Sequence, residues 1–168
     1  MKFPYGLADF RTLRTQGYFY IDRTDRIAKV EEFGLQLLLL RPRRFGKSLW
    51  LSTLENYYAI DRADQFTALL GDLAIGKNPT ERHNQYFILR WNFSEVVATG
   101  SAEQIGQALH QHINTCIQDF QMRYVQWLTQ PIDIDSRNCI VGFRHALSAT
   151  HETGHKIYLL IDEYDNFA

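Results

Sequence analysis

The feature that most constrains this chain is an apolar run that leads into a Gly-Lys-Ser tripeptide. Four leucines at residues 37–40 precede an arginine-rich turn, which ends in Gly46, Lys47 and Ser48. We expect the leucines to form a strand and Lys47 to begin a helix that continues to about Tyr58. At such a junction the backbone N–H groups face inward and the helix N-terminus adds positive charge. The pattern therefore predicts a phosphate-binding loop.

The loop departs from the usual Walker A pattern, because Arg41 stands where the first glycine is expected. The strand before the loop and the helix after it support the interpretation. Lys47 is predicted to neutralise the β- and γ-phosphates, and Ser48 to ligate Mg²⁺. The backbone N–H groups of residues 43–48 are predicted to cradle the phosphates. The predicted nucleotide-binding residues are Arg43, Arg44, Phe45, Gly46, Lys47, Ser48 and Leu49.

A second apolar run, at residues 157–161, ends in Asp162 and Glu163, as a Walker B strand does. Functional groups of parallel α/β sheets gather at the carboxyl ends of strands. We expect Asp162 to hold Mg²⁺ together with Ser48, directly or through water. Glu163 is predicted to polarise the attacking water as a general base, so Glu163 and Lys47 are the predicted catalytic residues. The alternative is a solvated arginine turn and an exposed strand end, which explains each piece but not their pairing.

Composition narrows the class of protein. The 168 residues are 45% hydrophobic and 22% charged, which is typical of a globular domain. The net charge of −1 gives no overall basic surface for nucleic acid. The start of the chain has no signal-peptide pattern, and four leucines are too few to span a membrane. Two cysteines form no disulfide framework, so we expect a cytoplasmic protein.

The remaining patterns alternate between helix and strand. Ser101 and Gln104 form a capping box for a helix over residues 102–129, and Thr24 is expected to cap a helix that Gly34 ends. Further helices are expected over residues 9–16 and 139–151, with short helices over residues 61–82. Strands are expected at residues 86–93 and at the run that ends in Asp162. This alternation predicts an α/β fold around a parallel sheet.

Four motifs carry a family resemblance. They are Phe3-Pro4-Tyr5-Gly6, Tyr20-Ile21-Asp22-Arg23-Thr24, the loop from Leu40 to Leu49, and Leu160-Ile161-Asp162-Glu163-Tyr164-Asp165. Together they resemble the bacterial and archaeal AAA-ATPase-like family, whose version of the loop includes Arg41. Arg23 stands where the family usually has lysine, and Asn166-Phe167 replaces a frequent lysine-proline pair.

The resemblance implies a P-loop NTPase-type three-layer α/β/α fold with a parallel sheet, and ATP and Mg²⁺ as cofactors. The implied strand order is 5-1-4-3-2, in which strands four and five are absent here and strand four would lie between strands one and three. We therefore expect a lead-in segment at residues 1–34 and, at residues 35–168, the N-terminal part of an ATPase domain that is incomplete at its C-terminus. Such a fragment is expected to be inactive alone and poorly soluble.

The expected function is an ATP-binding, Mg²⁺-dependent P-loop ATPase module. The resemblance implies that hydrolysis is coupled to a C-terminal nuclease-like or effector domain, through which nucleic acid would be a partner. It leaves an oligomer open. The alternative is a nucleotide-gated switch or scaffold that binds ATP with little turnover.

Overall fold

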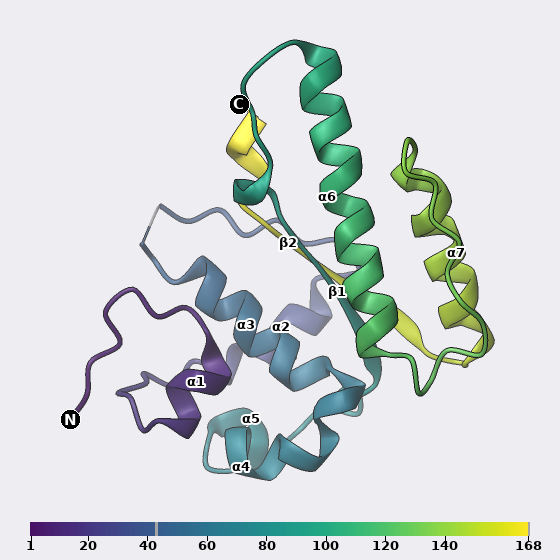
Figure 1. Cartoon of the computed structure of the whole chain (residues 1–168). Coiled ribbons are helices and arrows are strands. Elements are labelled where there is room, and N and C mark those ends of the chain that lie inside the picture. Colours follow the sequence, from purple (N-terminus) through teal and green to yellow (C-terminus); the bar gives the residue numbers. More distant parts are fainter. Residues whose placement is uncertain (43, 168) are drawn as a thin grey trace. The chain divides into compact units, whose positions relative to one another are not determined.

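The computed structural model describes residues 1–42 and 44–167 and divides the chain into two compact units, Met1–Gln85 and Tyr86–Ala168 (Figure 1). The first unit is helical, and the second contains a two-stranded parallel sheet with helices. The fold is therefore of the α/β class, as the sequence predicts. Arg43 lies outside the described residues.

The first unit is built around one central helix and several short ones. Its elements are α1 (Phe10–Thr15), α2 (Arg26–Glu32), α3 (Lys47–Tyr58), η1 (Ile60–Gln65), α4 (Phe66–Leu70) and α5 (Ala74–Lys77). The predicted bounds of α3 are confirmed at both ends. The core of this unit consists of Phe10, Leu13, Ile27, Leu54, Tyr57, Tyr58, Leu69, Leu70 and Ile75, all at most 4% exposed. Burial of these side chains is the main favourable term in the folding of this unit.

The lead-in segment is attached to the middle and to the C-terminal end of α3. The Phe10 N–H at the start of α1 donates to Oγ of Ser52 over 2.9 Å. At the end of α2, Oε1 of Glu31 accepts hydrogen bonds from the hydroxyls of Tyr58, at 2.9 Å, and Thr80, at 2.8 Å. Because these contacts join residues far apart in sequence, they fix the lead-in segment on the helix that follows the predicted loop.

Asp22 and Thr24 form a tight turn that reaches α5. Oδ1 of Asp22 accepts from the N–H of Thr24 at 2.8 Å and from its hydroxyl at 2.7 Å, and Oδ2 accepts from the Ala74 N–H at 2.8 Å. Oγ1 of Thr24 accepts from the Ile75 N–H at 3.1 Å. The prediction that Thr24 caps α2 is therefore wrong. Asp25 holds the N-cap position without a side-chain cap, and the Thr24 hydroxyl contacts Asp22 and Ile75 instead of the start of the helix.

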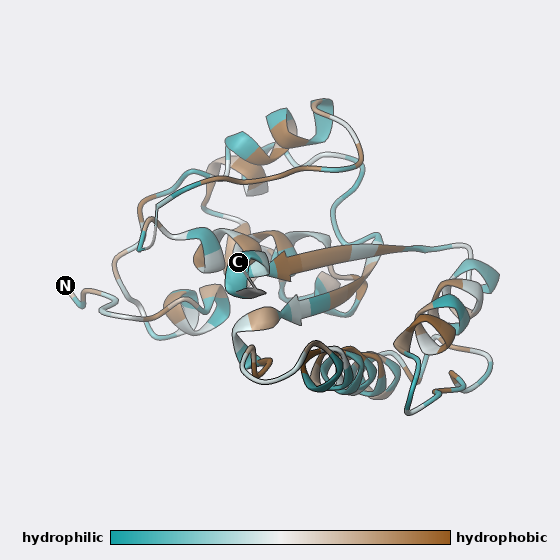
Figure 2. Cartoon of the chain, turned by 90° about the horizontal axis from the view of Figure 1, so that it is seen from above, coloured by the Kyte–Doolittle hydropathy of each residue, from teal (hydrophilic) through white to brown (hydrophobic). Residues whose placement is uncertain are grey.

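The leucines at residues 37–40 do not form the predicted strand. The chain is extended there, but no strand pairs with it within the described residues. Leu38 is 66% exposed and Leu40 is 67% exposed, and the segment stands out as hydrophobic in Figure 2. The reason is non-local. A strand needs a neighbour for its N–H and C=O groups, and an apolar run does not supply one.

The second unit is a parallel β-α-α-β arrangement. It comprises β1 (Tyr86–Asn92), η2 (Phe93–Glu95), α6 (Ala102–Arg123), α7 (Cys139–Glu152), β2 (Lys156–Asp162) and η3 (Tyr164–Phe167). The two strands pair in register from Tyr86↔Lys156 to Asn92↔Asp162. This pairing confirms the prediction of two parallel strands. The register also brings Asn92 and Asp162 to the same carboxyl edge.

Helix α6 begins as predicted but ends earlier. The capping box of Ser101 and Gln104 is present in both directions. The helix stops at Arg123 rather than near residue 129, and Tyr124 is its C-cap residue. The Tyr124 hydroxyl accepts a hydrogen bond from the Ile88 N–H at 2.9 Å, and its ring packs 4.7 Å from that of Phe87. These contacts with β1 account for the end of the helix better than a local sequence signal does.

Candidate functional site

The start of α3 has the backbone geometry of an anion-binding loop. Gly46 is the N-cap residue in the left-handed region (φ 76°, ψ 24°), and Arg44 is also left-handed (φ 67°). The first helical hydrogen bond runs from the Trp50 N–H to the Gly46 carbonyl at 2.9 Å. No side chain caps the helix, and within the described residues the N–H groups of residues 46–49 have no hydrogen-bond acceptor. Such free N–H groups, with the helix dipole, favour a bound anion.

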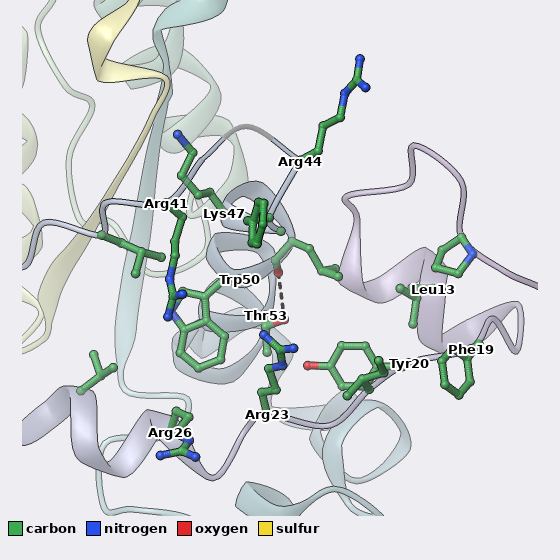
Figure 3. A pocket seen from close by; sticks show the side chains of 17 residues that line it. Leu13, Phe19, Tyr20, Arg23, Arg26, Arg41, Arg44, Lys47, Trp50 and Thr53 are labelled. Atoms are coloured by element: carbon green, nitrogen blue, oxygen red, sulfur yellow. Dashed lines mark hydrogen bonds between the residues drawn. The ribbon is translucent and has the colours of Figure 1, made fainter.

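The same helix N-terminus opens onto a strongly basic pocket. The pocket has a volume of about 560 Å³ and lies within the first unit (Figure 3). Among the described residues, five cationic side chains line it: Arg23, Arg26, Arg41, Arg44 and Lys47. No carboxylate is among the described residues that line it. A concave site with this charge attracts multivalent anions.

Most of these cations have no acidic partner. Nε of Arg26 lies 3.2 Å from Oδ2 of Asp25, whereas the other four cations form no ion pair within the described residues. Arg44 extends away from the other labelled side chains, while Arg23 points toward Tyr20 (Figure 3). The pocket therefore holds uncompensated positive charge that a phosphate chain can neutralise.

One wall of the pocket is apolar and aromatic. It is formed by the lead-in segment, the leucine run and α3, and includes Pro4, Leu13, Phe19, Tyr20, Ile21, Val30, Leu39, Leu49 and Trp50. Burial is the main cause that raises the pKa of the Tyr20 hydroxyl above its ordinary value of 10.0, so this group stays a neutral hydrogen-bond donor. A pocket lined by both apolar and cationic side chains suits a ligand that has a flat ring as well as negative charge.

Several of the predicted nucleotide-binding residues meet at this pocket. Arg44, Phe45, Gly46, Lys47 and Leu49 line it. Ser48 is in the first turn of α3 but is not among the lining residues, and Arg43 lies outside the described part of the chain.

The sequence motifs assign neither Arg23 nor Arg26 to a site, yet both residues line the pocket. A signal was available for Arg23. It lies between Asp22 and Thr24, two residue types that often form hydrogen-bonded turns. Because the side chains of such a turn bond to the backbone, the residue between them is left available for another contact.

The predicted carboxylates lie in the second unit. Asp162 is the last residue of β2 and is 5% exposed. Its Oδ1 accepts the Glu163 N–H at 3.1 Å, and its Oδ2 lies 3.7 Å from Nη2 of Arg90. A buried carboxylate needs such partners, because desolvation of an unpaired charge is costly.

Glu163 has an unusual backbone conformation. Its φ of 53° is in the left-handed region, which costs a non-glycine residue about 1–2 kcal/mol. Its carbonyl accepts the Asn166 N–H at 3.1 Å at the start of η3. Strained residues of this kind cluster at functional sites. A joint site of Glu163 and Asp162 with Lys47, which belongs to the first unit, stays a prediction from the sequence.

Ser48 and Asp162 each carry the oxygen donors that Mg²⁺ prefers, and their joint role as magnesium ligands stays a prediction from the sequence. This ion prefers oxygen ligands and keeps several waters, and one or two protein groups plus substrate phosphates are enough to hold it. Within the described residues no three histidine, cysteine or acidic side chains form a metal cluster.

An α/β fold in which a free helix N-terminus opens onto a cationic pocket is typical of nucleotide-binding proteins. The chain belongs to the AAA-ATPase-like family, described as "Predicted AAA-ATPase", whose model matches residues 4–168. Membership of this family suggests ATP binding. None of the helices within residues 1–42 and 44–167 combines the length and apolar character that a membrane crossing requires.

A curated protein is similar in sequence to a short part of the chain. It is an uncharacterized protein in the vnfD 5′ region of Azotobacter chroococcum mcd 1, and it is 42% identical over 59 residues. This match covers 34% of the chain but 11% of the relative's length. No solved structure matches the chain.

Proposed function

We propose that this chain is an ATP-binding module of the P-loop ATPase type. The observation that carries the proposal is the start of α3. Within the part of the chain that the structure describes, unpaired N–H groups and a left-handed Gly46 open there onto a pocket lined by five cationic side chains. The family description supports ATP as the nucleotide.

The phosphate chain would bind at the N-terminus of α3. The free N–H groups of residues 46–49 would donate to phosphate oxygens, and Lys47 would neutralise the terminal phosphates. Arg41 and Arg44 add positive charge to the same pocket. A hydrogen bond to a charged group contributes about 1.5–3 kcal/mol, so loss of the Lys47 contact should weaken binding by about 10–150-fold.

Hydrolysis would need the groups at the end of β2. Ser48 and Asp162 would hold Mg²⁺, which neutralises charge on the phosphates when bound. Glu163 would accept a proton from the attacking water as a general base. These roles follow from the sequence motif. The burial of Asp162 and the left-handed backbone of Glu163 support them.

The role of the module within the whole protein is also a proposal. We infer a lead-in segment at residues 1–34 and the beginning of an ATPase domain from residue 35 onward. The energy of hydrolysis would be coupled to a C-terminal nuclease-like or effector domain that acts in the cytoplasm, with nucleic acid as a partner of that domain.

One observation favours a second function, a nucleotide-gated switch with little turnover. Nη2 of Arg90 lies 3.7 Å from Oδ2 of Asp162. A guanidinium at this carboxylate competes with Mg²⁺ for the same oxygen and would slow hydrolysis without affecting nucleotide binding at α3. Phosphate release by protein that binds ATP separates the two functions, since a switch releases none at a measurable rate.

The test of nucleotide binding is the Lys47→Ala variant with a fluorescent ATP analogue at equilibrium. We expect the affinity to fall by about 10-fold or more. Lys77→Ala is the matched control, because Lys77 is exposed at the end of α5 and does not line the pocket. Unchanged binding in the Lys47→Ala variant would show that the loop assignment is wrong.

A further inference from the structure

Arg23 is held at the pocket by its neighbours in sequence. The hydrogen bonds of Asp22 and Thr24 with each other and with the start of α5 fix the turn that carries it. The Arg23 side chain is exposed, lines the pocket and forms no ion pair within the described residues. A cation on a rigid turn, without an acidic partner, is suited to bind a ligand rather than to stabilise the fold.

Arg23 lines a part of the pocket that is separate from the N-terminus of α3, where the phosphates are proposed to bind. Tyr20, Arg23 and Thr53 line the pocket, and their side chains lie close together (Figure 3). Thr53 is six residues beyond Lys47, or about 9 Å along the axis of α3. The groups around Arg23 are therefore not those that meet the terminal phosphates.

The surroundings of Arg23 suit a nucleoside. Tyr20 and Trp50 supply aromatic surface there, and Leu13, Phe19 and Val30 extend the apolar wall. A guanidinium has donors but no acceptors, and it is planar, so it can donate to ring nitrogens or ribose oxygens and stack on a base. Terminal phosphates would instead be expected where the free N–H groups lie.

We propose that the lead-in segment forms the nucleoside-binding half of the pocket and that Arg23 binds the base and ribose of the nucleotide. This inference rests on the nucleotide-binding function proposed above. It gives the lead-in segment a direct part in binding, because the turn at Asp22 and Thr24 positions a ligand-contacting side chain. Nucleotide selection would then depend on residues outside the phosphate-binding loop.

Calorimetry with three unlabelled ligands tests this assignment in the purified protein. For Arg23→Ala we expect the affinities for ATP and ADP to fall by the same factor, about 10-fold. Affinity for inorganic triphosphate, which has no nucleoside, should stay close to that of the parent when salt is high enough to screen the lost charge. Arg23→Lys should recover only part of the loss, because it retains the charge and a donor but not the planar guanidinium.

The controls separate this inference from the proposed function. Arg11→Ala removes the same charge from an exposed residue of α1 outside the pocket and should change none of the three affinities. Lys47→Ala should weaken all three ligands. If Arg23→Ala weakens ATP more than ADP, or weakens inorganic triphosphate equally, Arg23 contacts phosphate and the inference is overturned. It is also overturned if Arg23→Ala binds as the parent does. A parent that binds none of the ligands refutes the proposed function itself.

Discussion

Gly46→Ala isolates the backbone conformation on which the phosphate-binding loop depends. Gly46 has φ 76°, and a Cβ built on it has no atom within 4 Å, so the added methyl group meets no steric clash. The expected cost is therefore that of a left-handed backbone for an L-residue, about 1–2 kcal/mol. If the free protein keeps this conformation, the free energy of unfolding falls by that amount. If the loop relaxes, the same cost appears as about 5–30-fold weaker ATP binding.

Urea denaturation with and without saturating ATP measures both the loss of stability in the free protein and the loss of ATP affinity. The ATP-saturated variant should be less stable than the ATP-saturated parent by about 1–2 kcal/mol, however the cost is divided. Gly106→Ala is the control. Gly106 lies within α6, also has open space for a Cβ, and should become more stable by about 1 kcal/mol through helix propensity. A Gly46→Ala variant with unchanged stability and unchanged ATP affinity would refute the left-handed loop geometry.

Three further changes test other parts of the account. Glu163→Gln should bind ATP normally while turnover falls on the order of 10²-fold or more, and equal phosphate release would remove Glu163 from catalysis. Changing the exposed Leu38 and Leu40 to threonine should reduce aggregation in light scattering without lowering the unfolding midpoint, whereas a lower midpoint would mean that these leucines are packed. Burial alone would raise the pKa of Asp22, but hydrogen bonds from Thr24 and Ala74 outweigh it and lower the pKa. Asp22 should therefore stabilise the fold at pH values above 3.8, the ordinary pKa of its carboxyl group. This stabilisation should be lost as the pH falls through the lower pKa of the folded state. In denaturation curves Asp22→Asn should be less stable than the parent at neutral pH and equal to it in acid, and a difference that persists in acid would contradict this role.

The elements that the sequence predicted well have local signals. The capping box of Ser101 and Gln104 fixes the start of α6, and the Gly46-Lys47 step fixes the start of α3. The failures depend on contacts far apart in sequence. The leucines at residues 37–40 form no strand because none of the described strands pairs with them, and α6 ends early where Tyr124 meets Ile88.

The candidate site shows the same difference between residues that a local motif predicts and residues that depend on contacts far apart in sequence. Lys47 and the residues around it were predicted from a short motif, because the motif itself determines how the loop presents its N–H groups. Arg23 could not be assigned in this way. Its place in the pocket depends on the turn of Asp22 and Thr24 against α5, which a linear pattern does not describe. The position of Asp162 at the end of β2 follows from its apolar run, but its contact with Arg90 required the strand register.

The most direct test of the central claim is a titration of isotope-labelled protein with ATP, followed through backbone amide resonances. The proposed phosphate site predicts large shifts for the free N–H groups of Gly46, Lys47, Ser48 and Leu49, and much smaller shifts with adenosine at equal occupancy. Binding of ATP that leaves these four resonances in place would contradict the assignment of the N-terminus of α3 as the phosphate-binding site.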